Sequence, residues 1–455
     1  MAAYWGTTTK SLQMGLWKVI LSVVIIVLPC TAERTLELAQ VVFRHGARSP
    51  GLSFPTDNYT EASWPQGFGQ LTERGMKEQY ELGKWLRDRY VRKLKLLDGS
   101  YHQKEVMVRS SPRKRTVMSA LCNLQGLFPT EPGGPFEGTP PWQPVPVFAG
   151  QLNSDYMLHI KSTDCDAFND LPQTDEKSAD KVQYVTSHQD FFDEVKKNAG
   201  FTEDLVFHNY TRLADTLIRE KVEGRLLPSW VDEDTFNKLK DTLNFAFETK
   251  FSNMSREAKQ LFSGVLLKDL VTNINDHIDQ RNNDSKLFMY SGHDTVVAPL
   301  LGVFDVFNNV IPPTASCVLL ELYREDSGLY TVDLLFRNDT TQPPHLLKIP
   351  SCSEQCPVQT FRHIAEPYVV DDIQAVCRRK QPSPSLSFTW NFGWVLAASC
   401  LVLATIIPLI TCILLAVGSS GRRRIQAAKK RMEPINFHLL GGPNSESEDE
   451  SVFDT

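Results

Sequence analysis

The stretch Val41–Pro50 constrains the fold of this chain most, because it joins an apolar run to a basic turn. Residues 36–43 are largely apolar and β-prone, and Gly46 and Pro50 then interrupt the run, which predicts a strand that ends in a loop. The loop reads Arg44-His45-Gly46-Ala47-Arg48. Polar groups at the carboxyl end of a strand are typical of the ligand-binding edge of an open α/β sheet.

Arg44, His45 and Arg48 predict a phosphate site with a histidine nucleophile. Two guanidinium groups this close in sequence repel each other unless an anion lies between them, and the planar Arg fork matches phosphate oxygens. An imidazole beside a bound phosphoryl group can attack phosphorus and carry that group covalently. The pattern R-H-G-x-R-x-P fixes five positions. Chance produces it on the order of once in ten thousand chains of this length.

A second polar loop is predicted after the strand-like run 286–290, which leads into Ser291-Gly292-His293-Asp294. The leaving oxygen of a phosphate monoester needs a proton, which Asp294 can supply in its acid form. His293 can donate to a phosphoryl oxygen as imidazolium. Free Asp titrates near ~3.9 and free His near ~6.5, so both roles favour acidic conditions.

The R-H-G-x-R-x-P pattern resembles the signature of the histidine acid phosphatases, the branch of the histidine phosphatase superfamily that includes the lysosomal and prostatic enzymes. The resemblance continues through residues 63–72 and 290–295 and covers roughly residues 35–377. It implies an α/β fold of the phosphoglycerate-mutase type. In that fold a mixed, mostly parallel sheet is flanked by helices, and a helical cap domain is inserted.

The resemblance also implies an acid phosphatase reaction without cofactor or metal. His45 attacks phosphorus, Asp294 protonates the leaving group, and water then hydrolyses the phosphohistidine. The groups that hold the phosphoryl oxygens are Arg44, Arg48, Arg115 and His293.

Residues 109–116 resemble the second signature of the family, which is close to R-S-T-D-x-D-R-T. Pro112 and Lys114 stand at its acidic positions, so the rim of the site is more basic than in the typical member. By position Arg115 is the third phosphate-binding arginine. Arg113 and Lys114 are expected to lie solvated at a helix start.

Hydrophobic periodicity predicts an α/β catalytic domain in two segments, 33–140 and 262–378. Between them, residues 141–261 read as mostly helical, with candidate helices at 189–199, 206–221 and 233–250, which fits the cap. Further strands are expected at 105–109, 317–323 and 330–336.

Two apolar segments place the chain in the secretory system. Residues 1–32 read as a signal peptide, since a short apolar run ends in small residues. Residues 394–417 are apolar, uncharged and long enough to span a membrane. A basic flank follows, which predicts a type I single-pass protein with a stalk at 379–393 and a cytoplasmic tail at 418–455. A lysosomal or endosomal membrane is favoured over the cell surface.

The lumenal segment carries cysteines and glycosylation acceptors that fit this placement. Six lumenal cysteines allow fifteen pairings. The resemblance implies Cys165–Cys377 and Cys352–Cys356, and it leaves Cys122–Cys317 as a candidate third bridge. The expected N-glycosylation sites are Asn58, Asn209, Asn253, Asn283 and Asn338.

Composition and charge give no sign of a nucleic-acid-binding protein or of a metal site. The formal charge of −6 gives no reason to expect nucleic-acid binding, and ten His and nine Cys are too scattered to predict a metal site. The expected partner is a phosphate monoester substrate, and a homodimer is left open. Two alternatives remain: an inositol-phosphate or other specialised phosphatase of the same superfamily, and a catalytically weak membrane glycoprotein acting as a receptor or scaffold.

Overall fold

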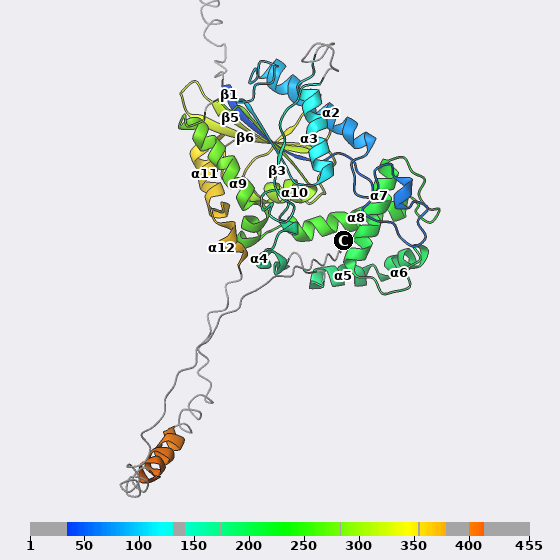
Figure 1. Cartoon of the computed structure of the whole chain (residues 1–455). Coiled ribbons are helices and arrows are strands. Elements are labelled where there is room, and N and C mark those ends of the chain that lie inside the picture. Colours follow the sequence, from blue (N-terminus) through cyan, green and yellow to red (C-terminus); the bar gives the residue numbers. More distant parts are fainter. Residues whose placement is uncertain are drawn as a thin grey trace, which may run out of the picture. The chain divides into compact units, whose positions relative to one another are not determined.

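The computed structural model describes residues 34–130, 142–172, 175, 177–282, 284–353, 355–378 and 400–413. The chain divides into two compact units, Met1–Arg379 and Lys380–Thr455. The described part of the first unit is a central sheet with helices on both faces (Figure 1).

The sheet is mixed, and its strands follow the order β3-β2-β4-β1-β5-β6-β7, with β8 paired to β6. The strands that pair in parallel are β1 (Thr35–Arg44), β2 (Val106–Ser110), β3 (Phe148–Ala149) and β4 (Leu287–Gly292). The strands that pair antiparallel are β5 (Cys317–Arg324), β6 (Tyr330–Arg337), β7 (His345–Leu346) and β8 (Cys356–Pro357). The expected mixed α/β class is confirmed, and parallel strands make up half of the sheet.

The helices of this unit alternate with the strands near its start, whereas a run of consecutive helices lies between β3 and β4. Their bounds are α2 (Glu73–Arg87), α3 (Lys114–Leu127), α4 (Asp166–Asn169), α5 (Ala179–Ser187), α6 (Gln189–Asn198), α7 (Phe207–Val222), α8 (Glu233–Phe251), α9 (Arg256–Ile278), α10 (Asp294–Val303), α11 (Val358–Ala365) and α12 (Ile373–Cys377). A π-helical turn, η3 (Asp88–Lys93), continues α2.

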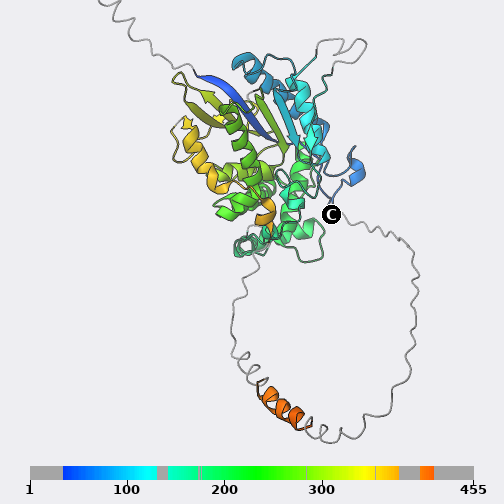
Figure 2. The same cartoon turned by 60° about the vertical axis from the view of Figure 1, so that its left-hand side comes forward.

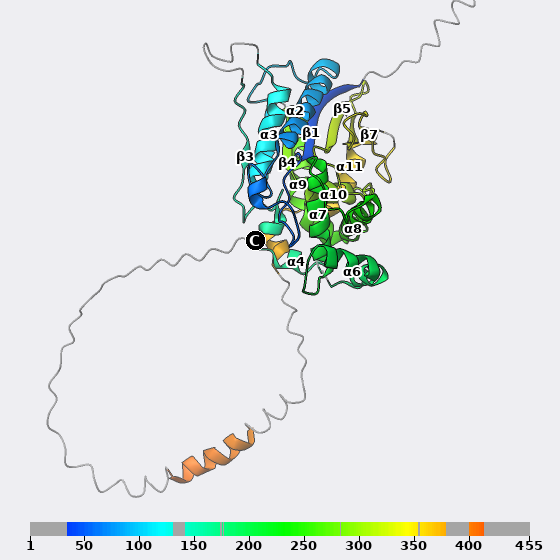
Figure 3. The ribbon, with the colours of Figure 1, turned by 90° about the vertical axis from the view of Figure 1, so that its right-hand side faces the viewer.

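Strand β1 is buried on both faces, and its side chains alternate between two apolar clusters. Leu38 and Val42 pack in the cluster that includes residues of α9, α10 and α11. Val41 and Phe43 pack in the cluster that includes residues of α2 and α3. The two groups of helices therefore cover opposite faces of the sheet (Figure 3). Burial on both sides explains why this strand reads as a continuous apolar run.

The segment between β3 and α9 is helical and has an apolar cluster of its own. Phe192 of α6, Tyr210 and Leu213 of α7, and Leu239 of α8 form its centre. Phe54, from the loop that follows β1, is buried in the same cluster, so this segment packs against the loop (Figure 2). The helices expected here match α6, α7 and α8, whereas the division into catalytic and cap domains stays a prediction.

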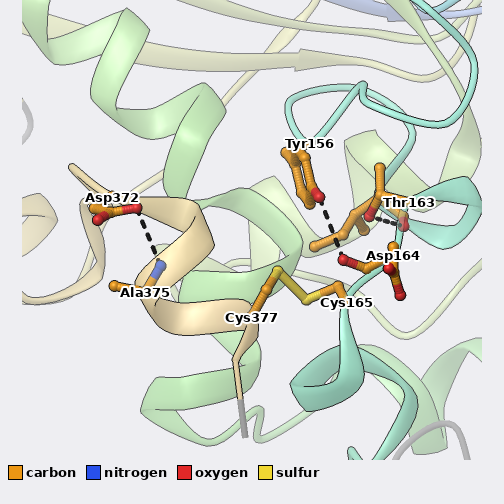
Figure 4. Close-up of a disulfide and its surroundings, with 8 residues drawn as sticks. Tyr156, Thr163, Asp164, Cys165, Asp372, Ala375 and Cys377 are labelled. Carbon is orange, nitrogen blue, oxygen red and sulfur yellow. Dashed lines mark hydrogen bonds between the residues drawn. A yellow bond between two sulfur atoms is a disulfide. The ribbon is translucent and has the colours of Figure 1, made fainter. Parts of the chain in front are cut away.

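Two disulfides are present. Cys165, at the start of α4, is bonded to Cys377 at the end of α12 (Figure 4). Tyr156 and Asp372 lie beside this bridge, where Asp372 caps α12 by accepting a hydrogen bond from Ala375 N at 3.0 Å. The second disulfide is Cys352–Cys356. Both pairings agree with the expectation.

The candidate Cys122–Cys317 bridge is wrong, because both thiols are free. Cys122 lies on α3, which packs over β2 and β4, whereas Cys317 lies in β5, two strands along the sheet from β4. Neighbouring strands are about 4.8 Å apart. A disulfide needs Cα atoms within about 7 Å, which this placement does not give.

Most of the secretory features lie outside the described residues: the signal peptide 1–32, the stalk 379–393, the tail 418–455 and Asn283. Within the predicted span 394–417, residues 400–413 form a helix. Among the residues that the structure describes, no helix is both long and apolar enough to cross a membrane. Of the other acceptors, Asn58 and Asn253 are exposed, while Asn209 and Asn338 are partly buried.

The contact between α2 and α3 yields a test of the fold. A Cβ added at Gly83 of α2 would collide with the backbone carbonyl oxygen of Asn123 on α3. Because backbone cannot yield as a side chain can, Gly83→Ala should lower the free energy of unfolding by about 3 kcal/mol. At Gly51 a Cβ would have no described atom within 4 Å, so Gly51→Ala is the control. Equal stability of the two variants in urea unfolding would contradict the close α2–α3 contact.

Candidate active site

Three loops meet at the carboxyl ends of the parallel strands β1, β2 and β4. In the sheet register Arg44 lies opposite Gly292, and Ser110 lies opposite Ser291. The pairing continues past the strand ends, where His45 N donates to the Gly292 carbonyl at 3.0 Å and Ser111 N donates to the Ser291 carbonyl at 2.9 Å. The three sequence motifs, far apart along the chain, are therefore side by side.

The loop after β1 lies against the N-terminus of α2. A Cβ at Gly46 would collide with the backbone of Gly75, and a Cβ at Gly75 would collide with Ala47. Thr72 caps α2 by accepting a hydrogen bond from Gly75 N at 3.1 Å, and Thr72 N donates to the Ala47 carbonyl at 3.0 Å. Glycine in the R-H-G motif therefore permits the close approach that fixes this loop.

His45 is buried, and its hydrogen bonding determines which nitrogen is free. Its Nδ1 lies 2.8 Å from the Gly46 carbonyl oxygen. A carbonyl can only accept, so Nδ1 carries the proton and Nε2 of the neutral ring keeps its lone pair. Burial, followed by repulsion from Arg115 and Arg44, holds the pKa of His45 well below its usual range. His45 is thus a neutral imidazole in acidic solution, which is the state a nucleophile needs.

His293 is also buried and occupies the N-cap position of α10, immediately before the first residue of that helix. Its Nδ1 lies 3.3 Å from Nη2 of Arg115, which can only donate, and its Nε2 lies 2.8 Å from Oγ of Ser111. Burial, then Arg115 and His159, hold the pKa of His293 well below its usual range. In the site without phosphate His293 is therefore a neutral ring that donates through Nε2, while its expected role as an imidazolium donor to a phosphoryl oxygen stays a prediction.

Arg44 and Asp294 form the ion pair at the centre of the site. Nη2 of Arg44 lies 2.6 Å from Oδ2 of Asp294, and Nη1 donates to the Pro312 carbonyl. Burial lowers the pKa of Arg44 to about 10, so it stays a cation. Its Nε is buried without a hydrogen-bond partner among the described residues. A phosphate oxygen can accept a hydrogen bond from a donor left in this state.

Arg115 lies where the sequence placed it, beside His293, and its Nε is likewise unpartnered within the described part of the chain. Burial, then repulsion from Arg48, lowers the pKa of Arg115 to about 9. Arg113 is not solvated as expected. It donates through Nε to Nε2 of His159 at 3.3 Å and through Nη2 to Oγ of Ser162 at 3.1 Å. Lys114 is exposed, as expected.

Sequence reasoning missed two residues of α7: Asp215, which pairs with Arg48, and Arg219, which holds Asp215. Nη2 of Arg48 donates to Oδ2 of Asp215 at 2.9 Å, while Arg219 donates through Nη2 to Oδ1 of the same carboxylate at 2.9 Å. Burial alone would raise the pKa of Asp215, but Arg219 and Arg48 together lower it well below the usual range. The only sequence signal is an acid–base pair four residues apart on a helix, which is common on surface helices.

Comparison with known proteins places this arrangement in a family. Residues 35–337 match the family model described as histidine phosphatase superfamily (branch 2). The chain belongs to this family. Prostatic acid phosphatase of Homo sapiens is 37% identical over 345 residues, which cover 76% of this chain and 88% of that protein. Lysosomal acid phosphatase of Homo sapiens is 36% identical over 367 residues, which cover 80% of this chain and 86% of that protein.

Among solved structures, the phytase of Hafnia alvei in complex with tartrate is similar in fold. The TM-score is 0.58 at 18% identity, and the match covers 76% of this chain and 98% of that one. The expected family and its class, phosphoric monoester hydrolases, are thus confirmed. In the described residues, no group of three or more His, Cys, Asp or Glu side chains is arranged to hold a metal ion.

The charge of Arg115 near His45 yields a test by pH. Because Arg115 is the largest electrostatic contribution that lowers the pKa of His45, Arg115→Gln should raise that pKa. A protonated His45 cannot attack, so activity is lost as pH falls through its pKa. The pH dependence of kcat/KM reports the pKa values of the free enzyme. Its acid limb should lie below pH ~6.5 in the unsubstituted protein and move to higher pH in Arg115→Gln.

Lys114→Gln removes the neighbouring charge on an exposed side chain and is the matched control. Both variants are assayed with the same ester, so titration of the substrate cancels. An acid limb that moves equally in both variants, or in neither, would show that Arg115 does not set the protonation of His45.

Proposed function

We propose that this chain is an acid phosphatase that hydrolyses phosphate monoesters through a phosphohistidine at His45. The observation that carries the proposal is the free Nε2 of a buried, neutral His45 among the cations Arg44, Arg48 and Arg115. Attack on a phosphate dianion requires a neutral nucleophile and cations around the phosphoryl oxygens. The acid phosphatases at 36–37% identity support the same reaction.

The first step forms a bond between Nε2 of His45 and phosphorus while the ester P–O bond breaks. Arg44, Arg48 and Arg115 neutralise the phosphoryl oxygens, and His293 donates one hydrogen bond through Nε2, which Ser111 accepts in the free site. When the ester binds, Arg44 leaves Asp294 and pairs with a phosphoryl oxygen instead. A phosphate anion beside Asp294 disfavours a second negative charge there, so the carboxylate takes up a proton from water at acidic pH and gives it to the leaving oxygen.

The second step releases phosphate. Water attacks phosphorus and gives a proton to the Asp294 carboxylate, the P–N bond breaks, and its electron pair returns to Nε2 of His45. Asp294 is suited to both proton transfers because its side chain is 19% exposed, so it lies at the mouth of the site and water reaches it. His45 is then a neutral ring again, and once phosphate has left, Asp294 loses its proton to water and pairs with Arg44 as in the free site.

The alternative of a catalytically weak receptor or scaffold receives less support. Such a protein would not need the predicted nucleophile, proton donor and phosphate-binding cations to converge from three strand ends. The alternative of a specialised inositol-phosphate phosphatase differs from this proposal in the substrate. The similar phytase structure does not support that alternative, because a likeness at 18% identity shows the fold alone.

The surroundings of this reaction are proposed from the sequence. We place the catalytic domain at 33–140 and 262–378 and the cap at 141–261, in the lumen or outside the cell. A signal peptide at 1–32 and a span at 394–417 with a basic flank support a single-pass type I protein. The lysosomal relatives support a lysosomal or endosomal membrane. N-glycosylation of the five acceptors and a homodimer stay predictions.

The decisive assay is hydrolysis of 4-nitrophenyl phosphate by the purified chain at acidic pH. We expect turnover without added metal, unchanged by EDTA, and loss of turnover by at least about a thousandfold in His45→Ala, since the covalent route is removed. His188→Ala alters an exposed histidine of the helical segment and should leave turnover intact. Activity that survives His45→Ala would rule out the phosphohistidine, and activity that needs a divalent ion would rule out the proposed charge neutralisation.

A further inference from the structure

A second cationic region lies beside the phosphate-binding groups. The His159 ring contacts the His293 ring edge to face, with centroids 5.0 Å apart, and the His293 ring is 5.5 Å from that of His45. Arg113 lies beyond His159 and donates to its Nε2. The segment Ile160–Ser162 completes the region, with Ser162 bonded to Arg113 and Lys161 exposed. The ring of His159 therefore lies between Arg113 and His293.

The positive charge of Arg113 is not compensated. Its hydrogen-bond partners are Ser162 and His159, and burial, then Arg113 and Arg115, lower the pKa of His159 to about 4, so both partners are neutral. No ion pair joins Arg113 to a carboxylate within the described residues, nor does its Nη1 make a hydrogen bond there. Arg113 also repels Arg115 and His293, since it lowers the pKa of both.

Like charges held this close need an anion between or beside them. The scissile phosphate meets this need at Arg44, Arg48 and Arg115. Arg113 is held outside that group, by contacts that orient its guanidinium and leave Nη1 available. Pro112 and Lys114, which replace the acidic residues of the family signature, leave the same rim without the carboxylates that would otherwise balance it.

We propose that Arg113, supported by Ser162 and Lys161, binds a second anionic group of the substrate. The substrate class is then a phosphate monoester that carries a carboxylate or a second phosphate a few bonds from the scissile phosphate. This inference rests on the proposed phosphatase activity and specifies its substrate. Arg113 sets specificity and takes no part in the chemical step.

The test compares esters that differ only in the second charge, with the purified full chain. In the first pair, 3-phosphoglycerate carries a carboxylate where glycerol 3-phosphate carries a hydroxymethyl group. In the second pair, the bisphosphate of 1,3-propanediol carries a second phosphate that propyl phosphate lacks. We expect kcat/KM to be about tenfold higher for at least one doubly anionic ester, mainly through KM, as for one charge-assisted hydrogen bond.

Arg113→Gln should reduce this ratio to about one, and Arg113→Lys should restore part of it, because a point charge replaces the fork. The ratio cancels any common loss of turnover or folded fraction. Lys114→Gln removes an equal charge from the adjacent exposed position and should leave the ratio within about twofold, since exposed charges are screened.

The outcomes separate the two claims. Equal kcat/KM for both members of each pair, or a ratio that Arg113→Gln leaves unchanged, would overturn the second-anion site while the phosphatase activity stands. A ratio that falls equally in Arg113→Gln and Lys114→Gln would assign the preference to the general potential of the rim and would also overturn it. Absence of hydrolysis of every ester, 4-nitrophenyl phosphate included, would overturn the proposed function itself.

Discussion

Repulsion among the guanidinium groups around His45 is the interaction on which the rest of this site depends. Arg44 and Arg48 come from the loop after β1 and Arg115 comes from α3, and burial makes the charges of Arg44 and Arg115 costly. Two carboxylates hold the cations in place, Asp294 on Arg44 and Asp215 on Arg48. Burial, together with the same positive field, keeps His45 neutral, so in the proposed mechanism the cations that bind the anion also help to keep the nucleophile unprotonated.

The scaffold makes this concentration of charge tolerable. Parallel pairing of β1, β2 and β4 fixes the three loops through backbone hydrogen bonds, which do not depend on the charged side chains. The Gly46–Gly75 contact then holds the first loop against the capped N-terminus of α2. Helix α7, from the segment that packs on Phe54, supplies Asp215. Electrostatic repulsion is thus opposed by packing and by backbone pairing at every segment that contributes a cation.

The sequence predicted those parts of the site in which local pattern and chemistry coincide. Arg44, His45, Arg48, His293 and Asp294 follow strands whose apolar character is visible, so their convergence could be predicted. Asp215 could not, because its partner Arg48 lies 167 residues away and only the tertiary structure brings them together. The contacts of Arg113 and the neutral state of His293 depend on burial and on His159, which no motif marks. The Cys122–Cys317 bridge failed for the same reason, since pairing depends on strand order.

The central claim is that a neutral His45 attacks phosphorus through Nε2, and the position of the phosphoryl group tests it most directly. The phosphoenzyme formed from an aryl phosphate is quenched in base, where phosphohistidine survives, and the phosphopeptide is analysed by ³¹P NMR. Because Nδ1 is engaged by the Gly46 carbonyl, we predict phosphate on Nε2 of His45 alone. Phosphate on Nδ1, or on any other residue, would contradict the account.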